Sequence, residues 1–380
     1  MWLAPEVYYT QCMTRLAFLS SPAVWERGHG PEHPLKPQRL RRTHELLQEA
    51  GALAWPEVKV VAPRVARDEE LALFHKRDYI DVVRALSRGD THLPASRYNF
   101  GPGDNPIFAG MFESEGRKVG SALQGARMLV DGECEVAFSY SGGLHHGGPD
   151  FASGFCVFND AAVAIHWLLR QGLRVAYVDI DVHHGDGVQD AFYDSDQVLT
   201  ISLHQTGRTL FPGTGFVEER GVGAGAGFSV NVPLPPYTTD ALYEEAFTAI
   251  APPLLDRFQP DVLVSQLGVD THYRDPLANM ALTTRGHEML FRKLAELAPR
   301  WLALGGGGYD MDVVPRSWAL AFALMAGRAM PERLPPTYRS RYGGETVHDR
   351  NAPDWTWEPE PRVAAQVRAV VDRVQEAQGI

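Results

Sequence analysis

Short runs of apolar and β-branched residues alternate along the chain with longer segments in which apolar residues recur every three or four positions. The short runs predict strands at Val58–Val61, Glu135–Phe138, Val175–Val182, Val198–Leu203, Asp261–Gln266 and Arg300–Leu304. The longer segments predict helices at Ala161–Gln171, Thr239–Phe258 and Thr284–Leu297. This alternation is typical of a parallel sheet covered by helices on both faces. We therefore predict an α/β fold, a single three-layer αβα domain around a central, mostly parallel sheet, with ligands beyond the carboxyl ends of the strands.

The two ends of the chain depart from this pattern. Leu16, Ala17 and Phe18 look like the first strand, so residues 1–12 are expected to be an N-terminal tail and residues 13–330 the main domain. The stretch Pro331–Pro361 looks loose. The segment Pro361–Gln378 then predicts a closing helix, so residues 331–380 are expected to be an extension packed on the same domain.

Composition excludes several classes of function. The 380 residues carry a net charge of −11, which argues against a nucleic-acid partner. Three cysteines are too few and too scattered for a disulfide scaffold or a cysteine-based zinc site, as expected in a reducing cytosol. No apolar run reaches about 18 residues, and the first residues lack the pattern of a signal peptide. The sequence predicts a cytoplasmic protein that binds neither nucleic acid nor membrane.

The strand predicted to begin at Val175 carries carboxylates and is the most informative element of the sequence. If it continues to Val182, Asp179, Asp181 and His183 project from one face. A solvated face would explain this alternation, but a central parallel strand is covered on both faces, where carboxylates need a partner or a metal. A second apolar run ends in Asp270, which alone could be a helix N-cap. One imidazole and two carboxylates that leave an open position are typical of a catalytic zinc set.

Two histidines and a tyrosine occur in glycine-rich loops. His145 and His146 are adjacent, which on its own could be a surface pair that binds metals. In a buried site each imidazole needs a carboxylate to fix its tautomer, and Asp179 and Asp186 are available. Tyr309 follows four glycines at the end of another apolar run.

Five motifs in order resemble the zinc-dependent histone deacetylase family of the arginase–deacetylase superfamily, in particular the bacterial acetoin-utilisation-type deacetylases. They are Gly-Gly-Leu-His-His at 142–146, Gly-Phe-Cys-Val-Phe-Asn-Asp at 154–160, Asp-Ile-Asp-Val-His-His-Gly-Asp-Gly at 179–187, Phe-Pro-Gly-Thr-Gly at 211–215 and Gly-Gly-Gly-Gly-Tyr at 305–309. The segment His33–Arg39 matches as well, and the resemblance extends from about Arg15 to Gly327. It implies the arginase–deacetylase fold.

The resemblance also implies a role for each residue of the reaction site. Zinc would be bound by Asp181, His183 and Asp270. His146 would be the general base, oriented by Asp186. His145, held by Asp179, would be its electrostatic partner. Tyr309 would donate a hydrogen bond to the amide carbonyl oxygen.

Substrate and potassium positions follow from the same resemblance. A narrow tunnel would be formed by Gly154, Phe155 and Phe211, with Leu277 nearby, Asp104 as an acid at the rim, and Arg39 beneath the site near the acetate exit. As alternatives, Phe155 and Phe211 could be core aromatics and Asp104 a turn residue. Potassium would bind at Asp179, Asp181, His183, Ser202 and Leu203, and a second ion at Phe192, Ser195, Val198 and Phe228.

The implied reaction is the zinc-dependent hydrolysis of an N-acetyl amide to acetate and a free amine. The expected substrate is N6-acetyl-lysine in a protein or peptide, with acetyl-CoA synthetase as the example that the family suggests. One alternative is an amidohydrolase for acetylpolyamines or other small acetylated amines. Such enzymes usually narrow the entrance by an insertion, and none is obvious between Ser87 and Asn105. Another is a non-catalytic binder of acetyl-lysine, against which the intact reactive residues argue.

Overall fold

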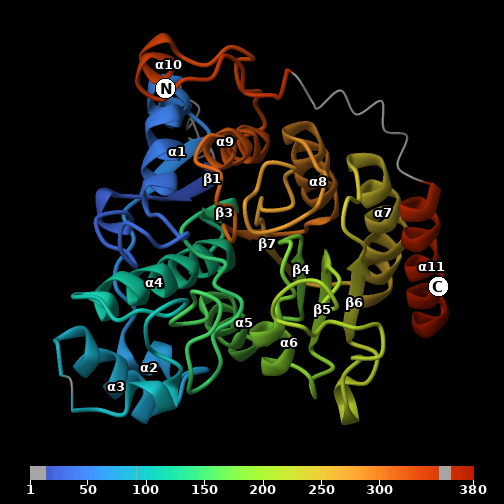
Figure 1. Ribbon diagram of the computed structural model, residues 1–380, viewed down its shortest axis with the longest axis horizontal. Helices are drawn as coiled ribbons and strands as arrows, with labels where there is room; N and C mark the ends of the chain where they lie inside the picture. The colour runs from blue at the N-terminus through green and yellow to red at the C-terminus, as the bar shows by residue number, and fades with distance from the viewer. Residues whose placement is uncertain (1–13, 91, 351–360) are drawn as a thin grey trace, which may run out of the picture.

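A computed structural model describes residues 14–90, 92–350 and 361–380, so the tail expected over residues 1–12 lies outside the described residues. Its centre is one eight-stranded sheet in the order β2-β1-β3-β8-β7-β4-β5-β6 (Figure 1). Every neighbouring pair is parallel, as the sequence predicts. The strands are β1 Thr14–Leu19, β2 Val58–Val61, β3 Cys134–Ser139, β4 Val175–Asp179, β5 Val198–Gln205, β6 Ser229–Leu234, β7 Val262–Gln266 and β8 Trp301–Leu304.

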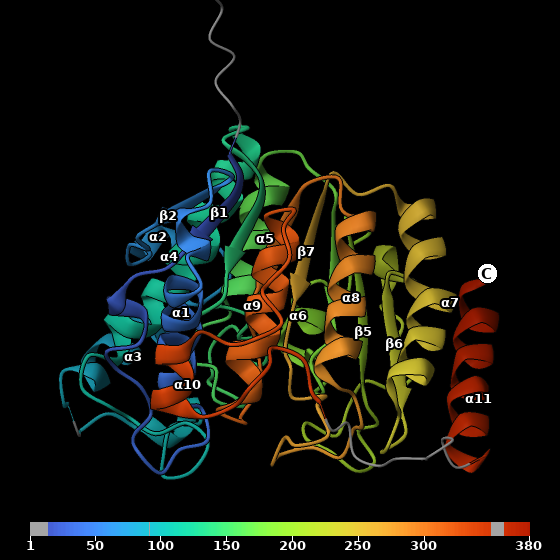
Figure 2. The same cartoon turned by 90° about the horizontal axis from the view of Figure 1, so that it is seen from above.

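Helices cover both faces of the sheet. One face packs against α1 Gln38–Glu49, α7 Asp240–Phe258, α8 Thr284–Leu297, α9 Val313–Met325 and α11 Pro361–Gln378, and Figure 2 shows the last four side by side. The other face packs against α4 Met111–Val130, α5 Asp160–Arg170 and α6 Asp186–Ala191. Helices α2 Asp68–Leu71 and α3 Arg77–Ser87 lie outside α4, and α10 Pro336–Tyr342 lies beside α1. Short 3-10 turns occur at Pro22–Val24, Ala52–Ala54, Ala95–Tyr98 and Gly223–Gly225.

Apolar side chains alternate between the two faces along the strands. In β1, Leu16 and Phe18 join the cluster under α1 and α9, whereas Ala17 and Leu19 join the cluster under α4 and α5. Helix α11 docks by a valine stripe at positions 363, 367, 371 and 374, all buried against α7 and β6. Each buried valine of this stripe stabilises the docked helix by roughly 1.5–3 kcal/mol.

The structure departs from the predicted elements at several places, and α1, α3, α4 and α9 are helices that were not predicted. Strand β4 ends at Asp179 rather than Val182, because the carboxylates of Asp179 and Asp181 accept the backbone N–H groups of Asp181 and His183 and fold the chain into a loop. Strand β6 occupies the edge of the sheet, where the sequence analysis had not placed a strand. The stretch Pro331–Pro361, in which the sequence predicted no regular element, contains α10, which is held by the buried Tyr338.

The sheet order explains how residues far apart in sequence meet. Strands β3, β8, β7 and β4 are consecutive neighbours, and their carboxyl ends lie at the same edge. The loops that follow them carry the two adjacent histidines, Tyr309, Asp270 and the Asp181–His183 segment, respectively. Four loops thus converge on one point, as expected for a parallel sheet.

Candidate active site

The loop after β4 is folded by its own carboxylates. Oδ1 of Asp179 accepts the N–H of Asp181 at 3.0 Å, and Oδ1 of Asp181 accepts the N–H of His183 at 3.0 Å. Aspartate commonly bonds the backbone two residues ahead in this way. The prediction that Asp181 and His183 share a strand face with Asp179 is therefore wrong, because both residues lie in the turns that follow the end of β4.

Asp181, His183 and Asp270 form a buried group whose ligand atoms all lie within 4.8 Å of one another. Nδ1 of His183 lies 3.0 Å from Oδ1 of Asp181 and 3.2 Å from Oδ2 of Asp270. Burial opposes a charged imidazole, but the two carboxylates more than compensate and raise the pKa of His183 to about 10. Burial and Asp181 raise the pKa of Asp270. Two carboxylates that face one imidazole nitrogen suit a divalent cation, which would take the place of that proton.

Neighbouring groups orient both carboxylates. Oδ2 of Asp181 accepts hydrogen bonds from Nε2 of Gln266 at 2.6 Å and from the N–H of Gly307 at 2.7 Å, and the N–H of Val182 donates to Asp270. A side chain on Gly307 would overlap the carboxylate of Asp270, so only glycine allows this loop to lie so close to Asp270. Sequence analysis missed Gln266. Its only signal was a polar residue at the end of the apolar run of β7.

The adjacent histidines form two linked pairs with carboxylates. Nδ1 of His145 lies 2.7 Å from Oδ2 of Asp179, and Nδ1 of His146 lies 2.6 Å from Oδ1 of Asp186. Burial disfavours charge on His145, but Asp179 and Asp181 outweigh it and raise its pKa to about 9. Burial and the neighbouring His145 lower the pKa of His146 to about 4. The structure thus joins the four residues in the arrangement that the resemblance implies.

Further groups that the sequence did not reveal hold this loop. Both oxygens of Asp160 accept backbone N–H groups, from Gly143 at 3.0 Å and Leu144 at 2.8 Å. Nδ2 of Asn159 donates to the carbonyl of Gly147 at 3.0 Å, and the Tyr177 hydroxyl donates to Asp179 at 2.7 Å. Asn159 and Asp160 are the last two residues of the motif at 154–160, and this was the sign in the sequence that they have a role.

Tyr309 enters the site from the loop after β8. Its N–H donates to Oδ2 of Asp275 at 2.8 Å, and Oδ1 of the same carboxylate accepts the N–H of Leu277 at 3.0 Å. Burial, together with Asp270 and Asp181, raises the pKa of Tyr309 well above its usual value, so the phenol keeps its proton. Asp275 is a positioning residue that the sequence analysis did not assign, and it links Leu277 to the tyrosine loop.

Two phenylalanines stand on opposite sides of the approach to the site. The ring of Phe155 meets Tyr309 edge-on with 5.8 Å between centroids, and the ring of Phe211 meets His146 edge-on at 5.1 Å. Phe155 has a φ of +71°, a strained conformation of the kind that clusters at functional sites. A side chain on Gly154 would collide with the ring of His146. The structure therefore brings the three predicted tunnel residues together above the histidine pair.

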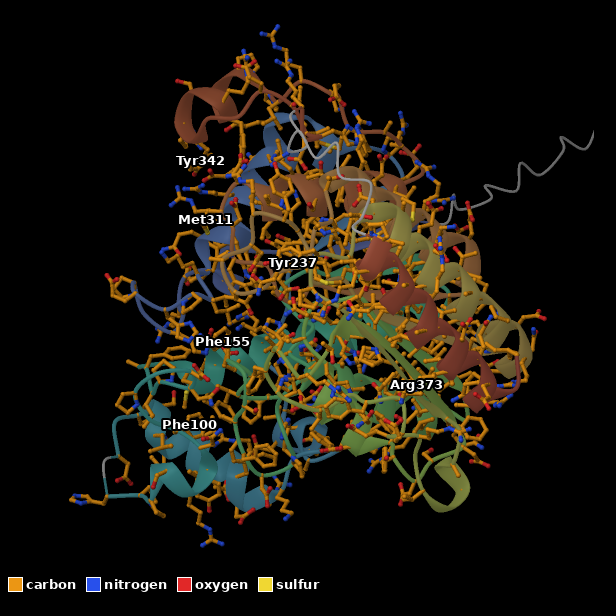
Figure 3. All side chains as sticks on the ribbon, turned by 45° about the vertical axis from the view of Figure 1, so that its right-hand side comes forward. Phe100, Phe155, Tyr237, Met311, Tyr342 and Arg373 are labelled. Atoms are coloured by element: carbon orange, nitrogen blue, oxygen red, sulfur yellow. The ribbon has the colours of Figure 1, made fainter. Side chains whose placement is uncertain are left out.

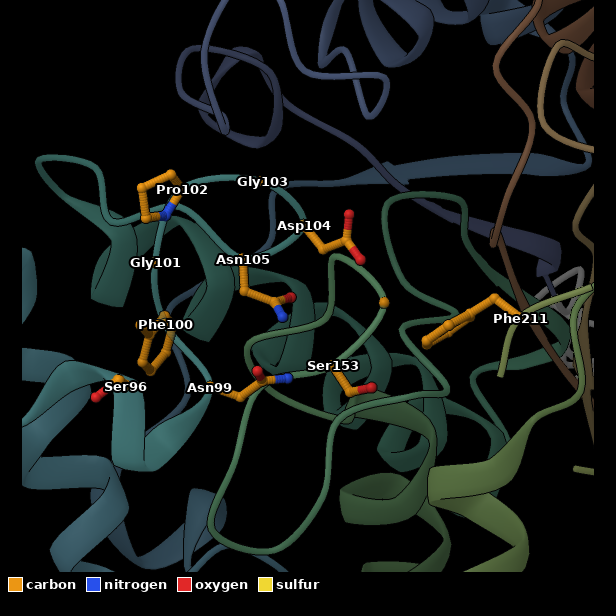
Figure 4. Close-up of a pocket in the computed structure, with 11 residues that line it drawn as sticks. Ser96, Asn99, Phe100, Gly101, Pro102, Gly103, Asp104, Asn105, Ser153 and Phe211 are labelled. Carbon is orange, nitrogen blue, oxygen red and sulfur yellow. The ribbon is translucent and has the colours of Figure 1, made fainter. Parts of the chain in front are cut away.

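The approach opens into a surface pocket of about 370 Å³. Figure 4 shows the carboxylate of Asp104 on one side of it and the ring of Phe211 on the other. Asp104 is exposed, and its backbone carbonyl accepts a bond from Nε2 of His33 at 3.2 Å. Asn105 Oδ1 accepts the N–H of Phe155 at 3.1 Å and so connects the rim to the tunnel wall. Figure 3 labels Phe155 together with Phe100, which also lines this mouth.

Arg39 lies beneath the glycine loop. Its Nη1 donates to the carbonyl of Gly306 at 2.7 Å and to that of Gly308 at 3.1 Å, and its guanidinium group lies 5.1 Å from the ring of Trp318. It also lines a small cavity of about 20 Å³ with Lys118. The role near an acetate exit that the resemblance implies for Arg39 stays a prediction.

The positions expected for potassium lie in β4 and β5 and in the segments beside β4, β5 and β6. Asp179 is opposite Ser202 in the pairing of β4 with β5, and Leu203 follows. Phe192 directly follows α6, Val198 begins β5, and Phe228 precedes β6, where its carbonyl accepts the N–H of Thr200. Ser195 donates its N–H to Phe192 at 3.0 Å. Binding of a cation at either position stays a prediction.

Comparison with known proteins agrees with this geometry. The family model of the histone deacetylase domain matches residues 33–325. The chain belongs to the histone deacetylase family. It is 42% identical over 331 residues to the acetoin utilization protein AcuC of Bacillus subtilis, with 84% of each chain covered. It is 40% identical over 308 residues to AcuC of Staphylococcus xylosus, with 79% of this chain and 80% of that one covered.

Solved structures of this family share the fold. A crystal structure of an HDAC homolog from Aquifex aeolicus is 30% identical and superposes with a TM-score of 0.84 over 96% of this chain and all of the other. A crystal structure of an HDAC homolog complexed with SAHA gives the same values. The arginase–deacetylase fold that the sequence predicts is confirmed. In the described parts of the chain, no helix is long and apolar enough to cross a membrane.

Proposed function

We propose that this protein hydrolyses N6-acetyl-lysine side chains of cytoplasmic proteins or peptides, with zinc held by Asp181, His183 and Asp270. The observation that carries the proposal is the histidine pair, bonded to Asp179 and Asp186, beside this buried group, with Phe211 against His146 and Phe155 against Tyr309. When bound, zinc would polarise the acetamide carbonyl and lower the pKa of water. Potassium would bind at the position formed by Asp179, Asp181, His183, Ser202 and Leu203, and a second ion would have a structural role at Phe192, Ser195, Val198 and Phe228.

The protein's own residues account for the proton transfers. At neutral pH the pair carries one positive charge, on His145, since its pKa is about 9 and that of His146 is about 4. Nδ1 of His146 is engaged by Asp186, so its Nε2 is the position that can accept a proton from the attacking water. The same Nε2–H then donates to the leaving amine. The phenol of Tyr309 donates to the oxygen on which negative charge develops.

The open mouth favours a protein or peptide substrate, acetyl-CoA synthetase being an example. Asp104 is exposed at the rim, and the side chain of Phe211 is 43% exposed. A carboxylate in this position can accept N–H groups from a peptide backbone on either side of the acetyl-lysine. The competing candidate, an acetylpolyamine amidohydrolase, would use the same carboxylate to bind a cationic amine.

One experiment separates these candidates and tests the metal. Purified protein is assayed side by side on acetyl-lysine peptides and acetylated polyamines, with metal content measured by elemental analysis. We expect higher kcat/KM on peptides, loss of activity after chelation and recovery with zinc. Asp270→Asn should lose the metal, whereas Asp256→Asn, an exposed carboxylate on α7, should keep it. Full activity in metal-free protein would refute the mechanism, and a preference for polyamines would favour the competing candidate.

A further inference from the structure

A second cleft lies at the amino-terminal ends of the strands, whereas the active site lies at their carboxyl ends. It is lined by residues that precede or begin strands, namely Arg174 before β4, Leu199 in β5 and Phe228 before β6. The ends of α7 and α11 complete it with Arg257, Phe258 and Gln378. Its volume is about 370 Å³, within the size range of small-molecule sites. We call it the arginine cleft.

Three arginines line this cleft, and backbone carbonyls hold each of them in place. Nη1 of Arg174 donates to the carbonyl of Phe258 at 2.7 Å, and Nη1 of Arg257 donates to that of Gln378 at 2.9 Å. Nη2 of Arg220 donates to the carbonyl of Ala377. Each guanidinium group therefore keeps most of its five donors for another partner.

None of the three is neutralised. Among the described residues, no carboxylate, that of the C-terminus included, lies within 4.0 Å of their guanidinium nitrogens. The neighbouring Asp261 instead accepts the backbone N–H of Arg174. By contrast, Arg368 and Arg373 of α11 pair with Glu245 and Glu218. Three unpaired cations around one cleft are unusual in a protein of net charge −11.

One buried donor in the cleft has no partner. Nε of Arg220 is inaccessible to solvent and makes no hydrogen bond within the described chain. An unpaired buried donor costs roughly 1–3 kcal/mol, and more when it is charged. The side chain is therefore kept beside the cleft although one of its donors is unpaired.

The rest of the lining is apolar. The rings of Phe228 and Phe258 meet edge-on with 5.9 Å between centroids, and the guanidinium of Arg174 lies 4.1 Å from the centre of the Phe258 ring. Leu199 and Leu254 complete this apolar wall. The cleft thus offers a cationic rim for an oxyanion and an aromatic and aliphatic wall for an organic body.

We propose that the arginine cleft is a binding site for a small organic oxyanion, a phosphate or carboxylate attached to an apolar group. Guanidinium groups bind both kinds of oxyanion through paired N–H donors. The site is separate from the deacetylase centre, because it lies at the amino-terminal edge of the sheet and shares none of the reactive residues. It therefore does not depend on the proposed function.

Calorimetric titration of the zinc-loaded full chain tests the proposal, with phenyl phosphate, benzoate and inorganic phosphate as probes at constant ionic strength. Phenyl phosphate or benzoate should bind more tightly than inorganic phosphate, because only they contact the apolar wall, and the stronger of the two identifies the oxyanion. Arg257→Gln should weaken binding roughly 10- to 100-fold. Arg368→Gln removes one positive charge from α11 outside the cleft and should leave affinity unchanged.

A second variant distinguishes a loss of binding at the cleft from misfolding of Arg257→Gln. Ala226→Leu narrows the cleft from an exposed position without removing a charge, and it should also weaken binding of phenyl phosphate. Failure of all three probes to bind at millimolar concentration would overturn the proposal. Binding that survives both Arg257→Gln and Ala226→Leu would equally overturn it. If that binding also disappears on removal of zinc, the anion occupies the deacetylase centre.

Discussion

The Nε2 atoms of His145 and His146 lie 3.0 Å apart, within hydrogen-bonding distance of each other. Two imidazoles at this distance cannot both be charged without strong repulsion, so the pair carries at most one positive charge. The carboxylates decide where it resides. Asp179 and Asp181 act on His145, whereas His146 is buried, faces the positive charge of His145 and has only Asp186 to favour its own charge.

This asymmetry supports the proposal that His146 is the base. Its replacement by alanine should lower kcat on an acetyl-lysine peptide by about 10²–10⁴, the usual contribution of a positioned general base. Metal content should be unchanged, because His146 is outside the Asp181, His183 and Asp270 group. Added imidazole should restore part of the rate. A variant with near-normal kcat would show that another group accepts the proton.

The rim carboxylate should matter for peptides and much less for small amines. Asp104→Ala should lower kcat/KM on an acetyl-lysine peptide. The loss of transition-state stabilisation should be roughly 1.5–3 kcal/mol, because a charge-assisted hydrogen bond to backbone N–H groups is lost. Acetylated amines without a peptide backbone should lose far less. Asp104→Asn, which keeps an acceptor without the charge, should fall between. Equal losses on both substrate classes would contradict the assignment and favour the polyamine candidate.

Glu70 gives a prediction for acid stability. Its carboxylate is 3% exposed and accepts bonds from Arg64 at 2.6 and 2.7 Å and from Arg127 at 2.8 Å. Burial opposes its charge, but Arg64 and the N–H of Arg67 outweigh burial and lower the pKa from 4.5 to about 2. A lowered pKa stabilises the folded state above pH 4.5, and that contribution disappears as the pH falls from about 4.5 to 2.

Glu70→Gln therefore should lower the free energy of unfolding at pH 7 by at most about 3 kcal/mol. The difference from the original protein should shrink as the pH is lowered below 4.5. Urea denaturation at pH 7, 5 and 3.5 measures it. Glu133→Gln, an exposed carboxylate paired with Lys59, is the control and should show little effect. A difference that stays constant with pH would contradict the argument.

Much of this arrangement was predictable from the sequence, because parallel strands place their terminal residues at one edge. The runs that end near Asp179, Asp270 and Tyr309 were visible as apolar segments, and the motifs identified the family. The exact path of the β4 loop was not predictable, because hydrogen bonds from Asp179 and Asp181 to the backbone fold it rather than the period of a strand.

Residues that act through other residues were also beyond the sequence pattern. Gln266 orients Asp181 and Asp275 holds the backbone of Tyr309, yet neither stands in a distinctive motif. The arginine cleft has no sequence signature, since Arg174, Arg220 and Arg257 come from three separate segments. Only the packing of α7 and α11 against the start of the strands brings them together.

The Tyr309→Phe variant tests the central claim most directly, that this site hydrolyses an amide through an oxyanion stabilised by a phenol. It removes one hydroxyl and leaves both the N–H bond to Asp275 and the edge-on contact with Phe155 available. Single-turnover and steady-state rates are measured on acetyl-lysine and trifluoroacetyl-lysine peptides, together with zinc content and peptide affinity. We predict a folded variant that keeps its zinc and binds peptide, with turnover of the acetyl substrate lower by about 10²–10³ and a smaller loss on the trifluoroacetyl substrate, whose carbonyl is already electron-poor. Near-normal turnover of the acetyl peptide by this variant would contradict the account.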